Sequence, residues 1–155
     1  MSYSGKFKPK NPQKYKGDCT QICYRSSWEL AVMAWCDVQA NVISWSSEEL
    51  VVPYLCPTDG AYHRYFVDFE IGLANGQMLW IEIKPKKQTV PPKRPKKQNR
   101  RYITEVMSYV KNQAKWKAAD EAAKKCGASF NVWTEDTLNN LGMKVLGVPC
   151  KKPTV

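Results

Sequence analysis

The spacing of hydrophobic residues along the 155-residue chain predicts two principal helices. Trp28, Val32 and Trp35 recur at helical intervals, and a serine pair just before them can cap a helix over residues 26–37. A second helix is predicted over residues 103–126, where alanine is frequent and a glycine follows the last residue.

Shorter apolar segments bounded by Gly, Pro and Asn predict strands. Four strands are predicted, at residues 50–54, 62–71, 78–84 and 129–133. A short helix is predicted after the last strand, at residues 135–141. With the two principal helices they give the order α-β-β-β-α-β. This order predicts one α/β (α+β) domain with helices packed on a mixed central sheet.

The second and third strands flank Ala74-Asn75-Gly76, which is a hairpin signal. A three-residue loop would place Asp68 opposite Glu82, whereas a two-residue loop would place Asp68 opposite Ile83. The three-residue loop is preferred because it gathers six apolar side chains on one face, namely Val67, Phe69, Ile71, Leu79, Ile81 and Ile83. A slip of one residue would split this set, which is costly where a face is buried.

In that register two carboxylates lie side by side, and Lys84 follows about 7 Å further along the same face. Adjacent carboxylates repel, so Asp68 and Glu82 need a cation between them or a proton on one of them. Oxygen ligands of this kind suit Mg²⁺ or Mn²⁺. Lys84 could then stabilise charge on a phosphate or position a water. The alternative is that Asp68, Glu82 and Lys84 are ordinary charged residues on an exposed strand face, with no catalytic role.

Charge along the chain is uneven and points to a polyanionic partner. The formal net charge is +10, and residues 84–101 hold nine basic residues and no acid. Lys and Arg bind phosphates by releasing counterions, so nucleic acid is favoured over a merely solubilising segment or a membrane surface. The predicted DNA-binding residues in this segment are Lys86, Lys87, Lys93, Arg94, Lys96, Lys97, Arg100 and Arg101.

Composition divides the chain into one domain with basic extensions. Residues 1–24 are expected to form a basic arm, 25–143 the domain, with 85–101 as a basic Pro-rich loop, and 144–155 a tail. Basic Pro-rich segments bury little apolar surface and are expected to be mobile. No apolar run approaches the roughly 20 residues of a membrane span, and the first residues lack a secretory signal. The six cysteines are therefore expected to be free thiols.

The string formed by Asp68, Glu82 and Lys84 resembles the (P)D-x(n)-(D/E)-x-K signature of the restriction-endonuclease-like superfamily. That superfamily has the core order αβββαβ, and its first helix often carries another acidic ligand, a position that Glu29 fits. Val67 departs from the pattern, in which proline often precedes the aspartate.

Longer strings resemble the head completion nucleases of tailed phages over nearly the whole chain. They are SYSGKFKPKNPQKYKGD, YRSSWEL, VVPY, RYFVDF, EIKP, NQAKWKAA and WTEDTL. The phage endonuclease I family, which resolves four-way junctions, is similar only over about residues 25–84.

The resemblance implies a metal-dependent DNA endonuclease that acts late in capsid maturation. Asp68 and Glu82 are implied to bind Mg²⁺, for which Mn²⁺ substitutes, while Glu29 completes or supports the metal site and Lys84 assists the water. Lys117, on the second helix, is implied to contact phosphate. Three further residues are interpreted from their positions alone. Arg25 is expected to touch phosphate or orient a carboxylate, with a plain cation at the helix start as the equal alternative. Glu48 and Glu49 are expected to be cap or exposed acids.

The expected location is the host cytoplasm or the virion, with DNA as partner, portal or head proteins as further candidates, and no membrane. A junction-selective nuclease and a non-catalytic protein that binds DNA or the portal are the alternatives.

Overall fold

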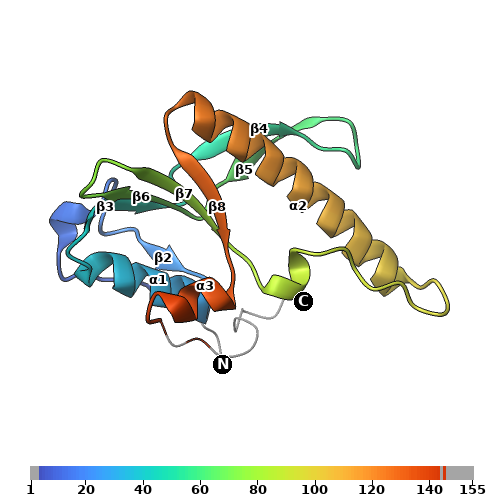
Figure 1. Ribbon diagram of the computed structural model, residues 1–155, viewed down its shortest axis with the longest axis horizontal. Coiled ribbons are helices and arrows are strands. Elements are labelled where there is room, and N and C mark those ends of the chain that lie inside the picture. The colour runs from blue at the N-terminus through green and yellow to red at the C-terminus, as the bar shows by residue number, and fades with distance from the viewer. Residues whose placement is uncertain (1–3, 144, 146–155) are drawn as a thin grey trace.

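The central sheet has four strands in the order β3-β6-β7-β8, and helices cover both of its faces (Figure 1). The structure is a computed structural model and describes residues 4–143 and residue 145. The strands are β3 (Val42–Ser47), β6 (Phe69–Leu73), β7 (Met78–Ile83) and β8 (Ser129–Trp133). Strand β6 is antiparallel to β3 and β7, whereas β7 and β8 are parallel, so the sheet is mixed as predicted.

Three helices and two smaller strand pairs complete the domain. The helices are α1 (Ser27–Val38), α2 (Arg100–Lys125) and α3 (Glu135–Asn140), with 3-10 turns η1 (Pro12–Lys14) and η2 (Lys86–Gln88). The antiparallel pairs are β1 (Gly5–Lys6) with β2 (Cys23–Tyr24), and β4 (Val51–Leu55) with β5 (Tyr62–Phe66). Helices α1 and α3 lie on one face of the sheet, and α2 lies across the other, against β4 and β8 (Figure 1).

Both long helices begin at side chains that cap their first turn. The Ser26 hydroxyl accepts a 3.1 Å hydrogen bond from the backbone three residues later, so α1 starts where the serine pair predicts. The side-chain oxygen of Asn99 accepts a 2.8 Å hydrogen bond from the Tyr102 backbone. Helix α2 therefore starts three residues earlier than predicted, and Arg100 and Arg101 belong to its first turn rather than to a loop.

The predicted hairpin register is confirmed. Phe69 pairs with Ile81 and Ile71 pairs with Leu79, which is the register of the three-residue loop. Gly76 has a φ of 89°, in the left-handed region where glycine carries no Cβ penalty.

Two predictions about the strands are wrong. The predicted strand 62–71 is broken at Val67 and Asp68, so that β5 and β6 belong to different sheets. Strand β3 was not predicted, and the chain is interrupted again between β3 and β4. The two breaks lie side by side, because the Glu48 backbone donates to the Asp68 carbonyl at 3.1 Å and the Val67 backbone donates to the Leu50 carbonyl at 3.0 Å.

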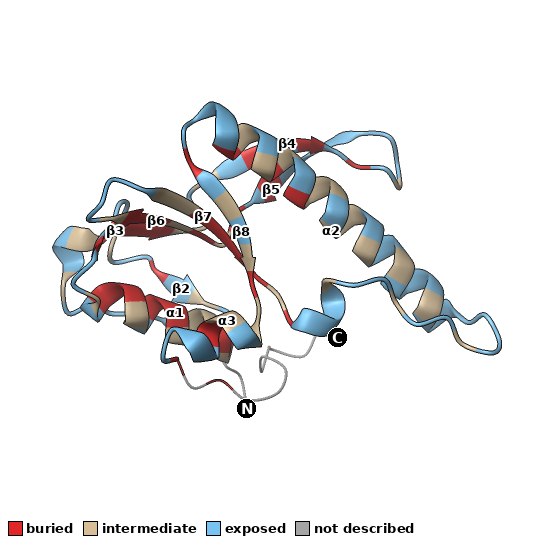
Figure 2. Ribbon diagram, viewed as in Figure 1, coloured by how far each residue is buried: buried red, intermediate tan, exposed pale blue. Residues whose placement is uncertain are grey.

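The core consists of two clusters, one on each face of the sheet (Figure 2). Trp28, Trp45 and Phe69 are at the centre of the cluster beneath α1. Trp80 and Trp116 belong to the cluster beneath α2. The face of β7 that carries Trp80 and Glu82 is therefore buried, which excludes the alternative of an exposed strand face. Because of the strand break, Val67 also lies in the second cluster rather than with Phe69.

The N-terminal segment is part of the domain over its described residues, contrary to the prediction of a separate arm. Tyr15 and Ile22 are buried in the first cluster. The buried carboxylate of Asp37, in α1, accepts hydrogen bonds from the backbone of Lys10 at 2.8 Å and of Asn11 at 2.9 Å. The predicted tail lies outside the described residues, apart from Val145.

Replacing Asp37 with alanine should lower the free energy of unfolding by about 2–4 kcal/mol, because two backbone N–H groups would be left without a charged acceptor. Urea unfolding would measure the change. The control is Asp120→Ala, which removes an exposed ion pair with Lys124 and should cost no more than about 1 kcal/mol. Equal losses in the two variants would mean that Asp37 does not hold the N-terminal segment.

Two further findings concern membrane-spanning segments and cysteines. Among the described residues, no helix combines the length and the apolar character needed to cross a membrane. The five cysteines within those residues are free thiols, as expected.

Candidate active site

Asp68 lies at the bend between β5 and β6, beside the end of β7. Its Oδ2 atom accepts a 2.8 Å hydrogen bond from the Ile83 backbone. Burial raises the pKa of Asp68 well above the ordinary range, and the negative charges of Glu82 and Glu29 raise it further. The Ile83 hydrogen bond and Lys84 lower this pKa without reversing the shift. The carboxylate is therefore poorly stabilised as an anion, and a nearby cation would stabilise it.

Three carboxylates converge at this bend. Oxygen atoms of Glu29, Glu48 and Asp68 all lie within 4.8 Å of one another. Glu29 comes from the first turn of α1, Glu48 from the break between β3 and β4, and Asp68 from the break between β5 and β6. The fold thus brings the predicted site residues Glu29 and Asp68 together, and it adds Glu48, which was not predicted as a site residue.

Glu48 was expected to be a cap or exposed acid, and that expectation is wrong. It has a φ of 55°, the one positive value among the described non-glycine residues. Such a conformation is unfavourable for glutamate and persists where surrounding contacts enforce it. Arg25 supplies one of these contacts, with its guanidinium 3.3 Å from a Glu48 oxygen. The Arg25 backbone also donates to Glu29 at 2.6 Å, so Arg25 orients carboxylates.

Glu82 faces a different set of partners and does not belong to this group of three in the described part of the chain. Its Oε2 atom accepts a 2.5 Å hydrogen bond from the Tyr65 hydroxyl, and its Oε1 atom lies 3.5 Å from the Lys84 Nζ atom. Burial and the charge of Glu82 raise the pKa of Tyr65, which keeps the hydroxyl protonated as a donor. Tyr65 was missed because no motif marks it.

The donor set at the bend fits a hard divalent cation. Three carboxylates within 4.8 Å repel one another unless a cation or protons compensate their charge. Oxygen donors without thiol or imidazole suit Mg²⁺ or Mn²⁺ rather than zinc.

A second group, Cys56, Asp59 and His63, lies at the tip of the β4–β5 hairpin. The Nε2 atom of His63 lies 2.6 Å from an Asp59 carboxylate oxygen there, and His63 is exposed.

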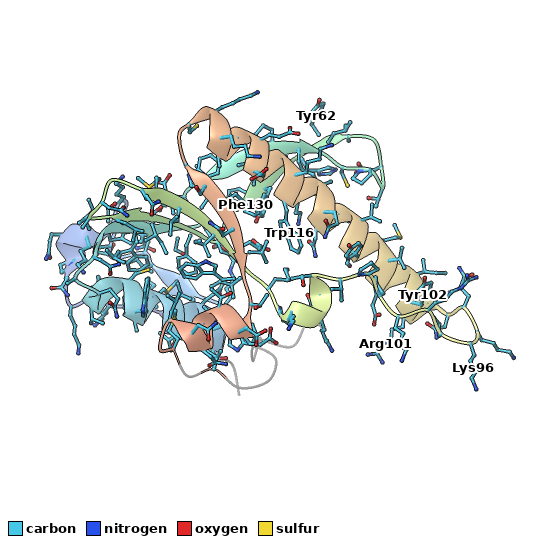
Figure 3. All side chains as sticks on the ribbon, in the orientation of Figure 1. Tyr62, Lys96, Arg101, Tyr102, Trp116 and Phe130 are labelled. Carbon is cyan, nitrogen blue, oxygen red and sulfur yellow. The ribbon has the colours of Figure 1, made fainter. Side chains whose placement is uncertain are left out.

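The predicted DNA-binding residues are exposed, and Arg25 among them contacts the carboxylates of Glu48 and Glu29. Lys86 pairs with Asp136 at 3.1 Å and Arg101 with Glu105 at 3.0 Å. Figure 3 shows Lys96 and Arg101 at the outer end of α2, away from the central sheet. The remaining exposed residues of the prediction are Arg25, Lys87, Lys93, Arg94, Lys97, Arg100 and Lys117.

A groove of about 610 Å³ separates the basic segment from the first half of α2. Lys87, Lys93 and Arg101 line it, together with Tyr109. These cations come from both sides of the groove, and Glu105, the ion-pair partner of Arg101, lines it as well.

The raised pKa of Asp68 predicts how stability depends on pH without added metal. A folded pKa above the unfolded value of about 3.9 means that the folded state binds more protons. The free energy of unfolding should therefore fall as the pH rises from about 4 through the folded pKa. Urea unfolding in EDTA between pH 4 and 8 should show this fall in the wild type and a smaller one in Asp68→Asn. Parallel curves for the two proteins would refute the assignment.

Comparison with known proteins identifies the class to which this fold and site belong. Residues 39–135 match the family model of the TnsA-like endonuclease N-terminal domain. The chain belongs to this family, and it is an endonuclease of restriction-endonuclease-like fold. It is 44% identical over 148 residues to the head completion nuclease of Enterobacteria phage T4, which covers 93% of this chain and 99% of that protein. No solved structure is a significant match.

These matches confirm the predicted superfamily and the resemblance to head completion nucleases. The family match includes Glu48, Asp68, Glu82 and Lys84, whereas Glu29 precedes it. The T4 relative extends the similarity over most of the rest of the chain.

Proposed function

We propose that the protein is a metal-dependent DNA endonuclease that acts on phage DNA or its ends during head completion. The convergence of Glu29, Glu48 and Asp68 within 4.8 Å is the observation that carries the metal dependence. The name of the T4 relative supports the role in head completion. The protein would then act in the infected cell or on the virion, with portal or head proteins as further partners.

Glu29, Glu48 and Asp68 would hold Mg²⁺, or Mn²⁺ in its place, and Glu82 would add negative charge beside them. When bound, the ion would lower the pKa of a water and polarise a phosphoryl oxygen. Arg25 holds Glu48 in position through its guanidinium and Glu29 through its backbone N–H.

Lys84 is the cation that faces the reacting phosphate in this proposal. Its Nζ atom would stabilise the negative charge that builds at phosphorus. Glu82 positions that atom, and Tyr65 in turn holds Glu82 through the second carboxylate oxygen. These three residues form a connected set next to the carboxylate cluster.

DNA cleavage with Mg²⁺ or with EDTA tests the proposal. Linear duplex, supercoiled circle and four-way junction should run in parallel. Cleavage that requires Mg²⁺ is expected, and the preferred substrate separates trimming of ends from resolution of junctions. Binding of all three DNAs without cleavage under either condition would instead indicate a structural protein built on a nuclease fold.

Binding to DNA should weaken steeply with salt, because the basic segment contacts backbone phosphates. The variant Lys93→Ala/Arg94→Ala should reduce the slope of log affinity against log salt by up to roughly 0.9 for each phosphate that the protein no longer neutralises. Fluorescence anisotropy with duplex DNA at several salt concentrations measures the slope. Lys124→Ala, at the other end of α2, is the control and should leave it unchanged. An unchanged slope in the double variant would exclude Lys93 and Arg94 from binding phosphate.

A further inference from the structure

The β4–β5 hairpin has one buried face and one exposed face. Tyr54 and Tyr65 point inward, into the cluster beneath α2. The outward face is formed by three cross-strand pairs, which are Val51 with Phe66, Pro53 with Arg64, and Leu55 with Tyr62. All six of these residues are exposed.

The outward face is unusually apolar for a surface. Tyr62 is 76% exposed, Leu55 52%, Phe66 45% and Val51 40%. Contiguous exposed apolar surface usually marks a binding site. The face carries no carboxylate, and the Arg64 guanidinium lies 5.7 Å from the centre of the Phe66 ring. Flat rings with one cation and no acid suit an anionic ligand that has flat apolar groups.

The position of this face connects it with the candidate active site. Phe66 lies two residues before Asp68, where β5 ends at the bend. Tyr62, Arg64 and Phe66 alternate along one side of β5, so neighbours in this row are about 6.6 Å apart. That spacing is similar to the separation of consecutive nucleotides in an extended single strand. The row therefore leads from the tip of the hairpin toward the carboxylates.

We propose that the outward face of the β4–β5 hairpin binds unpaired bases of the DNA substrate, which stack on Tyr62 and Phe66 while Arg64 contacts the backbone or a base. Aromatic side chains on a strand serve this purpose in proteins that bind single strands, because every base has a flat face. Figure 3 shows the Tyr62 side chain pointing away from the body of the domain.

This inference rests on the proposed function and adds the class of substrate. The preferred DNA carries a single-stranded extension of two or three nucleotides next to the duplex, as at a frayed or overhanging end. Arg64 and the absence of acids on this face favour DNA over a protein partner as the occupant, and the test below separates the two.

Binding without cleavage provides the test. Fluorescence anisotropy in EDTA would compare blunt duplexes with duplexes that carry a four-nucleotide 5′ or 3′ extension. We expect the wild type to bind one extended duplex more tightly than the blunt one. Tyr62→Ala should weaken binding of the extended duplex about tenfold and leave blunt binding unchanged, while Tyr62→Phe should retain the preference.

Two further measurements sharpen the test. A 2-aminopurine in the extension should be quenched on binding to the wild type and less quenched with Tyr62→Ala or Phe66→Ala. Ile43→Ala is the matched control, because Ile43 is 58% exposed but lies on β3 rather than on this face. It should behave as the wild type in both assays.

Several outcomes would overturn the inference. Blunt binding without any preference for an extension, or an equal loss on both duplexes in Tyr62→Ala, would reject the base-binding face while leaving the endonuclease proposal intact. A wild type that binds neither duplex in EDTA and cleaves neither with Mg²⁺ would reject both proposals. A change of oligomeric state in Tyr62→Ala, measured by sedimentation velocity, with unchanged DNA binding would assign the face to a protein interface instead.

Discussion

Asp68→Asn should lower the rate of Mg²⁺-dependent DNA cleavage at least about a thousandfold, equivalent to a loss of roughly 4 kcal/mol of transition-state stabilisation. Asparagine keeps the size of the side chain and can still accept the hydrogen bond from Ile83, which is 2.8 Å long in the wild type. It removes the negative charge shared with Glu29 and Glu48. The loss should therefore come from the chemistry rather than from the fold.

Single-turnover cleavage with saturating DNA measures this effect, and circular dichroism confirms that the variant is folded. Glu70→Gln is the matched control, because Glu70 pairs with Trp80 along the same hairpin but is outside the group of three. Its rate should stay close to that of the wild type. A rate for Asp68→Asn within tenfold of the wild type would reject Asp68 as a central ligand.

Glu48→Gln should raise the Mg²⁺ concentration required for half-maximal cleavage by about 10- to 100-fold, and excess Mg²⁺ should restore much of the rate. The reason is that one of three converging carboxylates is removed while the other two remain. Loss of a group that only orients a metal ligand costs about 10- to 100-fold in metal affinity, and loss of a ligand should cost at least as much. Titration of Mg²⁺ in the cleavage assay gives the value.

Glu49→Gln is a stringent control for this variant. Glu49 is the next residue, is exposed and does not belong to the group of three. Glu82→Gln offers a contrast, because Glu82 contacts Tyr65 and Lys84. It should lower the maximal rate more than the affinity for Mg²⁺. If Glu48→Gln and Glu49→Gln behaved alike, Glu48 would not be a ligand, and Glu82 would replace it as the candidate.

Local patterns predicted the parts of the fold that depend on neighbouring residues. The serine pair before Trp28 marked the start of α1, and the alternation around Phe69 and Ile81 selected the hairpin register. Both signals are local, because a cap acts within one turn and alternation assigns side chains to faces. The same register placed Asp68 near Glu82 and Lys84.

Strand β3 escaped prediction for an equally physical reason. Its register with β6 shifts between Val42 and Ser44, which interrupts the alternation that marks a strand. Without β3, the break that carries Glu48 could not be placed against the break that carries Asp68. Trp45 and Ser46 are both buried there, so the strand does not alternate between an apolar buried face and a polar exposed face.

The sequence by itself determined the principal elements, because periodicity is a property of short stretches. Its resemblance to a known family indicated the class of the protein and four candidate site residues. Only the tertiary structure decided that Glu48 joins Glu29 and Asp68, that Glu82 turns to Tyr65, and that the N-terminal segment is anchored on Asp37. These features depend on contacts between residues distant in the chain. The three carboxylates meet because the break between β3 and β4, the break between β5 and β6 and the first turn of α1 lie at one point.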